Sequence, residues 1–257
     1  MLFDWPSSAT FGRVIPKSRI YEQVRAGASL RRQFVKEVER ITWACKLAPE
    51  TVNLPATKEV PEIQVLHLTS RVPDLPESVL RAIDRAIPFP VIFELHCEGR
   101  ARTLAAPKRP YQADASRWTV GEYYRGSWVA EDAPRIPVPV VLNLGALYEH
   151  ILTTLIRAHV GSLQTQLTDH EPNGAFAGHG DGAKESPLPL EEMLALAERI
   201  RGARREVEKL QRKLAQTRQF NRRVELNARL RTARQHLQQL LARMQGNDRR
   251  GETHDEA

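Results

Sequence analysis

The stretch "EIQVLHLTSRVPDLPESVLRAIDRAIPFPVIFELHCEGRARTLAA", residues 62–106, decides the fold of this chain. Apolar side chains alternate along 62–71 and occur on both faces, which predicts a strand in the centre of its sheet. Residues 74–88 carry an apolar stripe at helical spacing between two prolines, so we expect a helix. Residues 91–97 and 101–106 are then predicted to be two strands joined at a tight Glu-Gly-Arg turn.

Further helices and strands are predicted on both sides of this stretch. Residues 18–25 and 29–47 have the spacing of amphipathic helices, the second with a stripe through its whole length. Residues 118–130, "WTVGEYYRGSWVA", are rich in aromatic and β-branched side chains and predict a further strand. Residues 143–160 predict another helix. The order indicates an α+β fold, with an antiparallel or mixed sheet and helices on one face.

The chain is expected to have four parts. Residues 1–167 form the globular domain, with an apolar content large enough for one sizeable core. Residues 168–189 are rich in Gly, Pro and polar side chains and predict a flexible linker. Residues 190–245 form a helical arm, and residues 246–257 form a disordered tail.

The arm has two apolar seams with a period near 3.5, which are out of phase with each other. The break lies within "QFNRRVELNARLR", residues 219–231. A helical hairpin explains it, with a bend near residues 217–221 and Asn221 as a possible N-cap of the second helix. One long helix that forms a homodimeric coiled coil is the alternative. The seam residues are Ile200, Ala203, Val207, Leu210 and Leu214, then Leu226, Leu230, Ala233, Leu237, Leu240 and Met244.

Charge is unevenly distributed along the chain. The net charge is +7, but residues 199–250 hold 16 Lys or Arg against 4 acids, a net +12. The remainder is 22 basic against 27 acidic, a net −5. A mildly acidic body with a cationic arm indicates a polyanionic partner, most simply nucleic acid, although a solvated helix surface would have the same composition.

Most of these cations have no opposite charge four residues away on the same helix. Contact with phosphates would therefore be salt-dependent and would involve the DNA backbone, without reading its sequence. Two ion pairs at spacing four on one helix are expected, Glu208 with Arg212 and Glu225 with Arg229. The predicted nucleic-acid-binding residues are Arg201, Arg205, Lys209, Arg212, Lys213, Arg222, Arg223, Arg229 and Arg234.

Common catalytic and cofactor motifs are absent from the sequence, so no cofactor and no metal is expected. A nuclease of the Asp…Glu-x-Lys kind could use only Asp84, Glu94 and Lys108, whose spacing does not fit, and surface charge on a sheet is the favoured interpretation. His96 and Cys97 are adjacent in a strand and so face opposite sides. His170 and His179, with neighbouring Asp169 and Asp181, lie in the predicted linker, and Trp118, Tyr123, Tyr124 and Trp128 are interpreted as packing residues.

A cytoplasmic location is expected. No window of the sequence predicts a membrane span, and the amino terminus lacks the basic start and apolar run of a signal peptide. Two cysteines, Cys45 and Cys97, are too few for a disulfide framework or a cysteine-rich zinc site.

Several stretches together resemble an uncharacterised bacterial family, that of the domain of unknown function 4391. They are "FDWPSSATFGRVIPK", "FVKEVERITWACKLAPETVNL", "EIQVLHL", "LRAIDRAIPFPVIFEL", "LYEHILTTLI" and "RQFNRRVELNARLR". The resemblance implies an α+β body with a helical C-terminal tail, and genes near DNA methyltransferases and helicases of restriction or phage-defence loci. It supplies no catalytic residues. Pro107 precedes Lys108 where a non-proline residue is expected in this family.

The expected function is that of a non-enzymatic accessory protein in a DNA-modification or phage-defence locus. Its cationic arm would bind DNA, or a partner on DNA such as a methyltransferase or helicase. A metal-dependent nuclease with an unrecognised site, and a scaffold that binds another protein through a coiled coil, are the alternatives.

Overall fold

The structure is a computed structural model that describes residues 1–111, 114–168, 188–244 and 246. The predicted linker and tail, with His170 and His179, therefore lie largely outside the described residues. The chain divides into two compact units, Met1–His159 and Val160–Ala257, which we treat separately. Helix α5 (Leu144–Thr168) contains the boundary between them.

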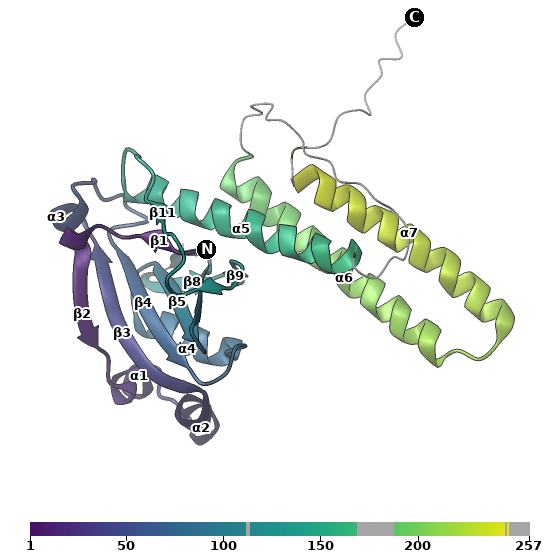
Figure 1. Cartoon of the computed structure of the whole chain (residues 1–257), viewed down its shortest axis with the longest axis horizontal. Coiled ribbons are helices and arrows are strands. Elements are labelled where there is room, and N and C mark those ends of the chain that lie inside the picture. Colours follow the sequence, from purple (N-terminus) through teal and green to yellow (C-terminus); the bar gives the residue numbers. More distant parts are fainter. Residues whose placement is uncertain (112–113, 169–187, 245, 247–257) are drawn as a thin grey trace, which may run out of the picture. The chain divides into compact units, whose positions relative to one another are not determined.

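The first unit is built on a seven-stranded sheet (Figure 1). Its order is β10-β6-β5-β4-β3-β2, and β9 also pairs with β6. The strands are β2 (Thr10–Val14), β3 (Val38–Leu47), β4 (Ile63–Ser70), β5 (Val91–Cys97), β6 (Arg100–Ala105), β9 (Tyr124–Arg125) and β10 (Val129–Ala130). Two small sheets pair β1 (Phe3–Asp4) with β11 (Ile136–Pro137) and β7 (Lys108–Tyr111) with β8 (Asp114–Val120).

The predicted central strand is confirmed, since β4 lies between β3 and β5. β4 and β5 are parallel and are connected through helix α4 (Glu77–Ala86), whereas the other pairs of the large sheet are antiparallel. The sheet is therefore mixed, as the sequence predicts. Between β5 and β6, Glu98 and Gly99 have φ of 51° and 71°, the left-handed pair of a two-residue hairpin turn.

We expect Gly99→Val to cost about 1–2 kcal/mol of folding free energy, because a β-branched residue is strained at this positive φ. No neighbouring atom lies within 4 Å of a Cβ added there, so the cost should be conformational only. Gly99→Asn is the matched control and should cost less, since Asn tolerates the left-handed region. Urea unfolding of both variants measures the difference, and equal costs would contradict this account.

Helices α1 (Lys17–Gln23), α2 (Ala28–Glu37) and α4 pack on one face of the sheet (Figure 1). Phe34 of α2 and Ile83 of α4 contact a core that includes Leu66 of β4 and Phe93 of β5, and all four are fully buried. Short helices η1 (Ser7–Ala9) and α3 (Pro49–Val52) lie in the connections. Because side chains alternate along a strand, the residues next to Leu66 and Phe93 face the opposite side of the sheet.

The prediction of one helix over residues 29–47 is wrong in its second half. Helix α2 ends at Glu37, and β3 begins at Val38. β3 is rich in β-branched and aromatic residues and pairs along almost its whole length with β4, so tertiary pairing outweighs the helical spacing of its apolar residues. The strands β1 and β2 were not predicted.

In the second unit, α6 (Leu190–Gln216) and α7 (Phe220–Met244) pack against each other as a helical hairpin (Figure 1). The predicted hairpin is confirmed, and one continuous helix is excluded by the break at residues 217–219. The residues of both seams are buried or half-buried. Asn221, however, lies inside the first turn of α7: the Arg223 amide donates to the carbonyl of Gln219, so Asn221 is not the N-cap.

Candidate functional site

The nine predicted nucleic-acid-binding residues all lie on the hairpin. Arg201 and Arg234 are half-buried and the other seven are exposed. Arg201, Arg205, Lys209 and Lys213 follow one another at spacing four on α6, which places them in a row on the side away from the buried seam. The row is thus a continuous cationic strip.

On α7 the cations do not form a single row. Arg222 and Arg229 are seven residues apart and share one flank of the helix, whereas Arg223 and Arg234 are eleven apart and share the other. The nine side chains therefore occupy several faces of the hairpin.

Acidic residues neutralise only part of this charge. Arg229 pairs with Glu225 at 3.8 Å, as predicted, and Lys209 lies 3.5 Å from Glu206. Glu208 instead pairs with Arg204 at 3.0 Å, and Arg212 donates to the backbone carbonyl of Glu208 at 3.4 Å. The prediction of an ion pair between Glu208 and Arg212 is therefore wrong.

These ion pairs are solvent-exposed, so each contributes little to stability. Arg205, Lys213, Arg222 and Arg223 form no ion pair with another residue in the described part of the chain. The hairpin therefore keeps a large positive charge that a polyanion can use.

The predicted nuclease trio is not assembled. Lys108 Nζ lies 2.7 Å from Asp84 Oδ1 and also donates to the backbone carbonyls of Asp84 and Ile87, at the C-terminal end of α4. Tyr123 donates from its hydroxyl to Asp84 Oδ2 at 2.8 Å. Glu94, the third residue of the trio, projects from the other face of the sheet, because its neighbour Phe93 packs in the helix-side core.

Asp84 and Lys108 form a buried structural pair, and Glu94 is also buried, so the favoured interpretation of these residues as surface charge is wrong. Burial raises the pKa of Asp84, and Lys108 offsets this only in part. Burial likewise lowers the pKa of Lys108 against the opposing effect of Asp84. Both groups are almost fully enclosed, which leaves no room for a substrate. The aromatic residues Tyr123 and Tyr124 are buried, consistent with packing.

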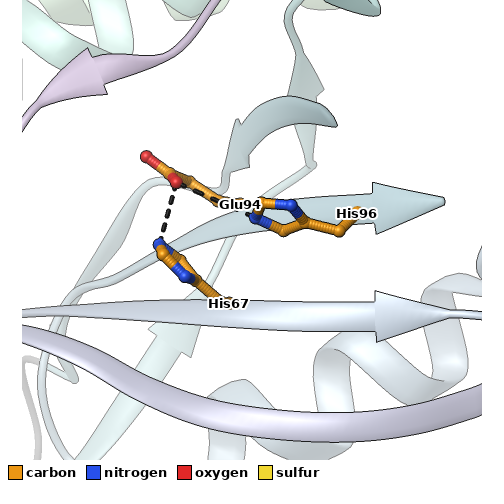
Figure 2. A group of neighbouring side chains, drawn as sticks. All are labelled: His67, Glu94 and His96. Atoms are coloured by element: carbon orange, nitrogen blue, oxygen red, sulfur yellow. Dashed lines mark ion pairs between the residues drawn. The ribbon is translucent and has the colours of Figure 1, made fainter. Parts of the chain in front are cut away.

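A different polar cluster lies on the face of the sheet opposite helices α1, α2 and α4, and the sequence did not predict it. His67 of β4 is the cross-strand partner of Glu94 of β5, and His96 follows two residues later on the same face. Figure 2 shows the three side chains pointing toward one another. His67 Nε2 lies 2.9 Å and His96 Nε2 lies 4.0 Å from Glu94 Oε2.

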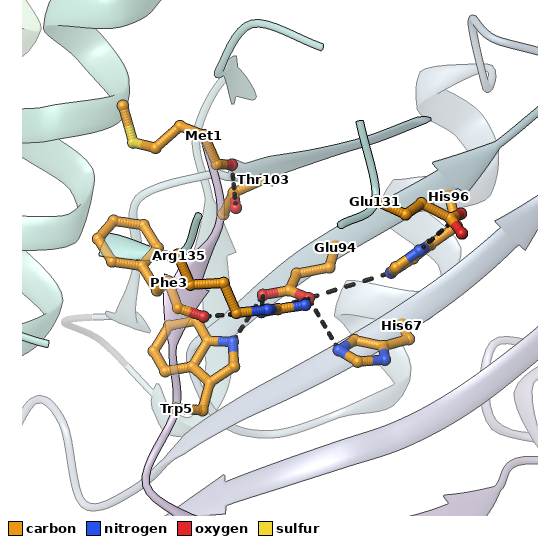
Figure 3. A network of polar contacts seen from close by, with 9 residues as sticks. All are labelled: Met1, Phe3, Trp5, His67, Glu94, His96, Thr103, Glu131 and Arg135. Carbon is orange, nitrogen blue, oxygen red and sulfur yellow. Dashed lines mark hydrogen bonds and ion pairs between the residues drawn. The ribbon is translucent and has the colours of Figure 1, made fainter. Parts of the chain in front are cut away.

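Segments distant in sequence complete the surroundings of Glu94 (Figure 3). Trp5 donates from its indole nitrogen to Glu94 Oε1 at 2.7 Å, and Arg135 contacts both carboxylate oxygens at 3.2–3.4 Å. Burial alone would raise the pKa of Glu94, but His67, Arg135 and Trp5 together hold this pKa below its ordinary value. The carboxylate is therefore kept ionised although it is fully buried.

A cavity of about 310 Å³ adjoins this cluster. His67 and Arg135 line it together with polar residues of β1, β2 and β3, including Asp4 and Thr42. Cys45 also lines it, and burial raises the pKa of this thiol to about 11, so it is protonated at neutral pH. The cavity gives a small polar ligand access to His67 and Arg135.

Only a weak sequence signal could have revealed the cluster. "VLHL" and "ELHC" place a histidine in two predicted strands, and Glu94 precedes His96 at the two-residue spacing of one strand face. The parallel register that sets His67 beside Glu94 is not visible in the sequence. Among the described residues, no helix combines the length and apolarity that a membrane span needs.

Comparison with curated proteins and with solved structures finds no significant match. A family pattern, in contrast, matches residues 3–237, which include the sheet, the polar cluster, α6 and most of α7. The chain belongs to the family described as Domain of unknown function (DUF4391).

Proposed function

We propose that the protein is a non-enzymatic accessory protein that binds the DNA backbone through the α6–α7 hairpin. The observation that carries this proposal is the cationic strip on α6, which lies opposite the buried seam and retains most of its charge. Within this strip Arg205, Lys209 and Lys213 are exposed, so their charges can contact phosphates. Because the contacts are electrostatic, binding should not depend on base sequence.

The family resemblance suggests the setting. Neighbouring DNA methyltransferases and helicases of restriction or phage-defence loci would be partners that share the same DNA. A cytoplasmic location is part of this proposal and fits the two free cysteines, Cys45 and Cys97. A homodimer through the arm also remains a prediction, which sedimentation of the purified chain would test.

The test is a charge-neutralised variant of the full-length chain. Arg205→Gln, Lys209→Gln, Lys213→Gln and Arg223→Gln are combined, and binding to a 30-base-pair duplex is followed by fluorescence anisotropy at low salt. We expect binding at least about 100-fold weaker than that of the wild type, because four phosphate contacts and their released counterions are lost.

The matched control removes four exposed cations of the first unit: Arg19→Gln, Arg32→Gln, Lys36→Gln and Arg40→Gln. It changes the net charge equally and should bind within about twofold of the wild type, unless binding follows overall charge alone. Equal losses in both variants, or none in either, would remove the hairpin as the binding surface.

The scaffold alternative has a support of its own, since Phe220 and Val224 are exposed apolar side chains next to the bend of the hairpin. If the arm binds a helicase or methyltransferase directly, association should persist at high salt and without DNA. The nuclease alternative loses its proposed trio, because Glu94 lies on the opposite face of the sheet from Asp84 and Lys108.

A further inference from the structure

We propose that His67, Glu94 and His96 form a binding site for one divalent cation of the zinc class. The proposal concerns the first unit alone and is independent of DNA binding by the hairpin. It rests on the donor atoms, on two hydrogen-bond-free imidazole nitrogens, and on the groups that orient these ligands.

The donor atoms already lie near the spacing that a metal ion requires. His67 Nε2, Glu94 Oε2 and His96 Nε2 all lie within 4.8 Å of one another. Ligands at about 2.0–2.1 Å from a tetrahedral zinc ion are about 3.3 Å apart. The measured separations of 2.9 and 4.0 Å from Oε2 fall on either side of this value, so small side-chain rotations would complete the site.

Two buried imidazole nitrogens lack hydrogen bonds. The Nε2 atoms of His67 and His96 are both inaccessible to solvent, and neither has a hydrogen-bond partner among the described residues. The approach of His67 to Glu94 has the distance of an ion pair without the direction of a hydrogen bond. Buried polar atoms are rarely left without a partner, and a bound cation would satisfy both.

The groups around the ligands orient them for this role. His96 Nδ1 lies 3.1 Å from Glu131 Oε1, and since a carboxylate only accepts, Nδ1 carries the proton, so that in the neutral imidazole Nε2 keeps its lone pair. Carboxylates in this position orient histidine ligands of metal ions. On Glu94, Trp5 donates to Oε1 and Arg135 contacts Oε1 at 3.2 Å and Oε2 at 3.4 Å, so Oε2 is the oxygen that faces both Arg135 and the two histidines.

Arg135 supports a purely structural alternative, in which the network only neutralises a buried carboxylate. Arg135 and Trp5 alone would stabilise the buried carboxylate. Their contacts do not explain why two histidine nitrogens without hydrogen bonds lie near Oε2. Two imidazoles and one carboxylate suit zinc or another late first-row ion, whereas Mg²⁺ and Ca²⁺ prefer sites made of oxygen ligands. The cavity beside His67 would admit a water or an anion as a fourth ligand.

The experiment measures binding of Zn²⁺ to the chelator-treated, full-length chain by equilibrium dialysis with elemental analysis. The wild type is expected to bind one equivalent more than the His67→Gln/His96→Gln variant. A His150→Gln/His236→Gln variant, which removes two exposed histidines, should retain that equivalent. Glu131→Gln should weaken binding by about 10–100-fold, since it removes only the orienting carboxylate. Excess Mg²⁺ or Ca²⁺ should not compete.

Imidazole ¹⁵N spectra of the wild-type chain provide a second measurement, made directly on the histidine nitrogens. Zn²⁺ should shift the Nε2 resonances of two histidines, and the His67→Gln and His96→Gln single variants assign them. Equal Zn²⁺ binding by the wild type and the double variant would overturn the proposal. So would unchanged Nε2 resonances of buried histidines, since this would leave the cluster a polar network without a cation.

Discussion

The affinity of the full-length chain for duplex DNA is expected to fall by about 10³-fold between 50 and 200 mM monovalent salt. The nine predicted cations of the hairpin lie on several faces, so we take about six of them as contacting the phosphates of one duplex. Six contacts predict a slope of about −5 in a plot of log affinity against log salt concentration. Anisotropy titrations across a salt series measure this slope directly.

The charge-neutralised variant gives a second test, because its salt slope can be compared with that of the wild type. Loss of Arg205, Lys209, Lys213 and Arg223 should make the slope shallower by about 3–4, because each lost phosphate contact removes close to one unit. The first-unit control with four neutralised cations should keep the wild-type slope. A salt-independent affinity in the wild type would mean that the charge only keeps the arm solvated.

The second large effect is expected in the buried pair on the helix side of the sheet. Lys108→Met should lower the free energy of unfolding by about 3–5 kcal/mol, because it leaves Asp84 buried without its cation. It also removes the donor to the carbonyls of Asp84 and Ile87. Urea unfolding followed by circular dichroism measures the loss.

A double variant, Asp84→Asn/Lys108→Met, should recover most of that loss, since no uncompensated charge remains and Asn still accepts from Tyr123. The Ile87 carbonyl loses its Lys108 donor, whereas the Asp84 carbonyl still accepts from the Ile87 amide, so a deficit of about 1–2 kcal/mol should remain. Lys46→Met is the control nearer the surface: it breaks the pairs of half-buried Lys46 with exposed Glu50 and half-buried Glu62 and should cost less than about 1 kcal/mol. A double variant as unstable as Lys108→Met would contradict this account.

The pH dependence of Lys108→Met has a definite sign. Burial raises the pKa of Asp84 in the folded state above its ordinary value of 3.8, and removal of the cation raises it further. The unfolded chain therefore loses this proton at lower pH than the folded chain. The destabilisation should be smallest below pH 3.8, should grow as the pH rises from there toward the folded-state pKa of Asp84 in the variant, and should level off above that pKa. A deficit that shrinks with rising pH would exclude desolvated Asp84 as its cause.

Local patterns in the sequence determined the central elements of the protein. The strands β4, β5 and β6, the helix α4 and the Gly99 turn follow from alternation, helical stripes and turn residues within a few positions of each other. The hairpin follows from two seams whose phases disagree, because one straight helix cannot bury both against the same partner. The cationic row on α6 follows from spacing alone.

Tertiary structure alone decided the rest, because the deciding contacts join residues far apart in the chain. Residues 38–47 become a strand since β4 offers them a pairing partner, which their helical spacing does not reveal. Glu94 lies on the opposite face of the sheet from Asp84, because side chains alternate along β5 and Phe93 packs in the core beneath the helices. His67 lies beside Glu94 and His96 only because of the parallel register of β4 and β5. Trp5 and Arg135, which both contact Glu94, are far apart in the sequence. Register and the choice of buried face depend on the whole sheet, so the sequence supplies these residues without specifying that they meet.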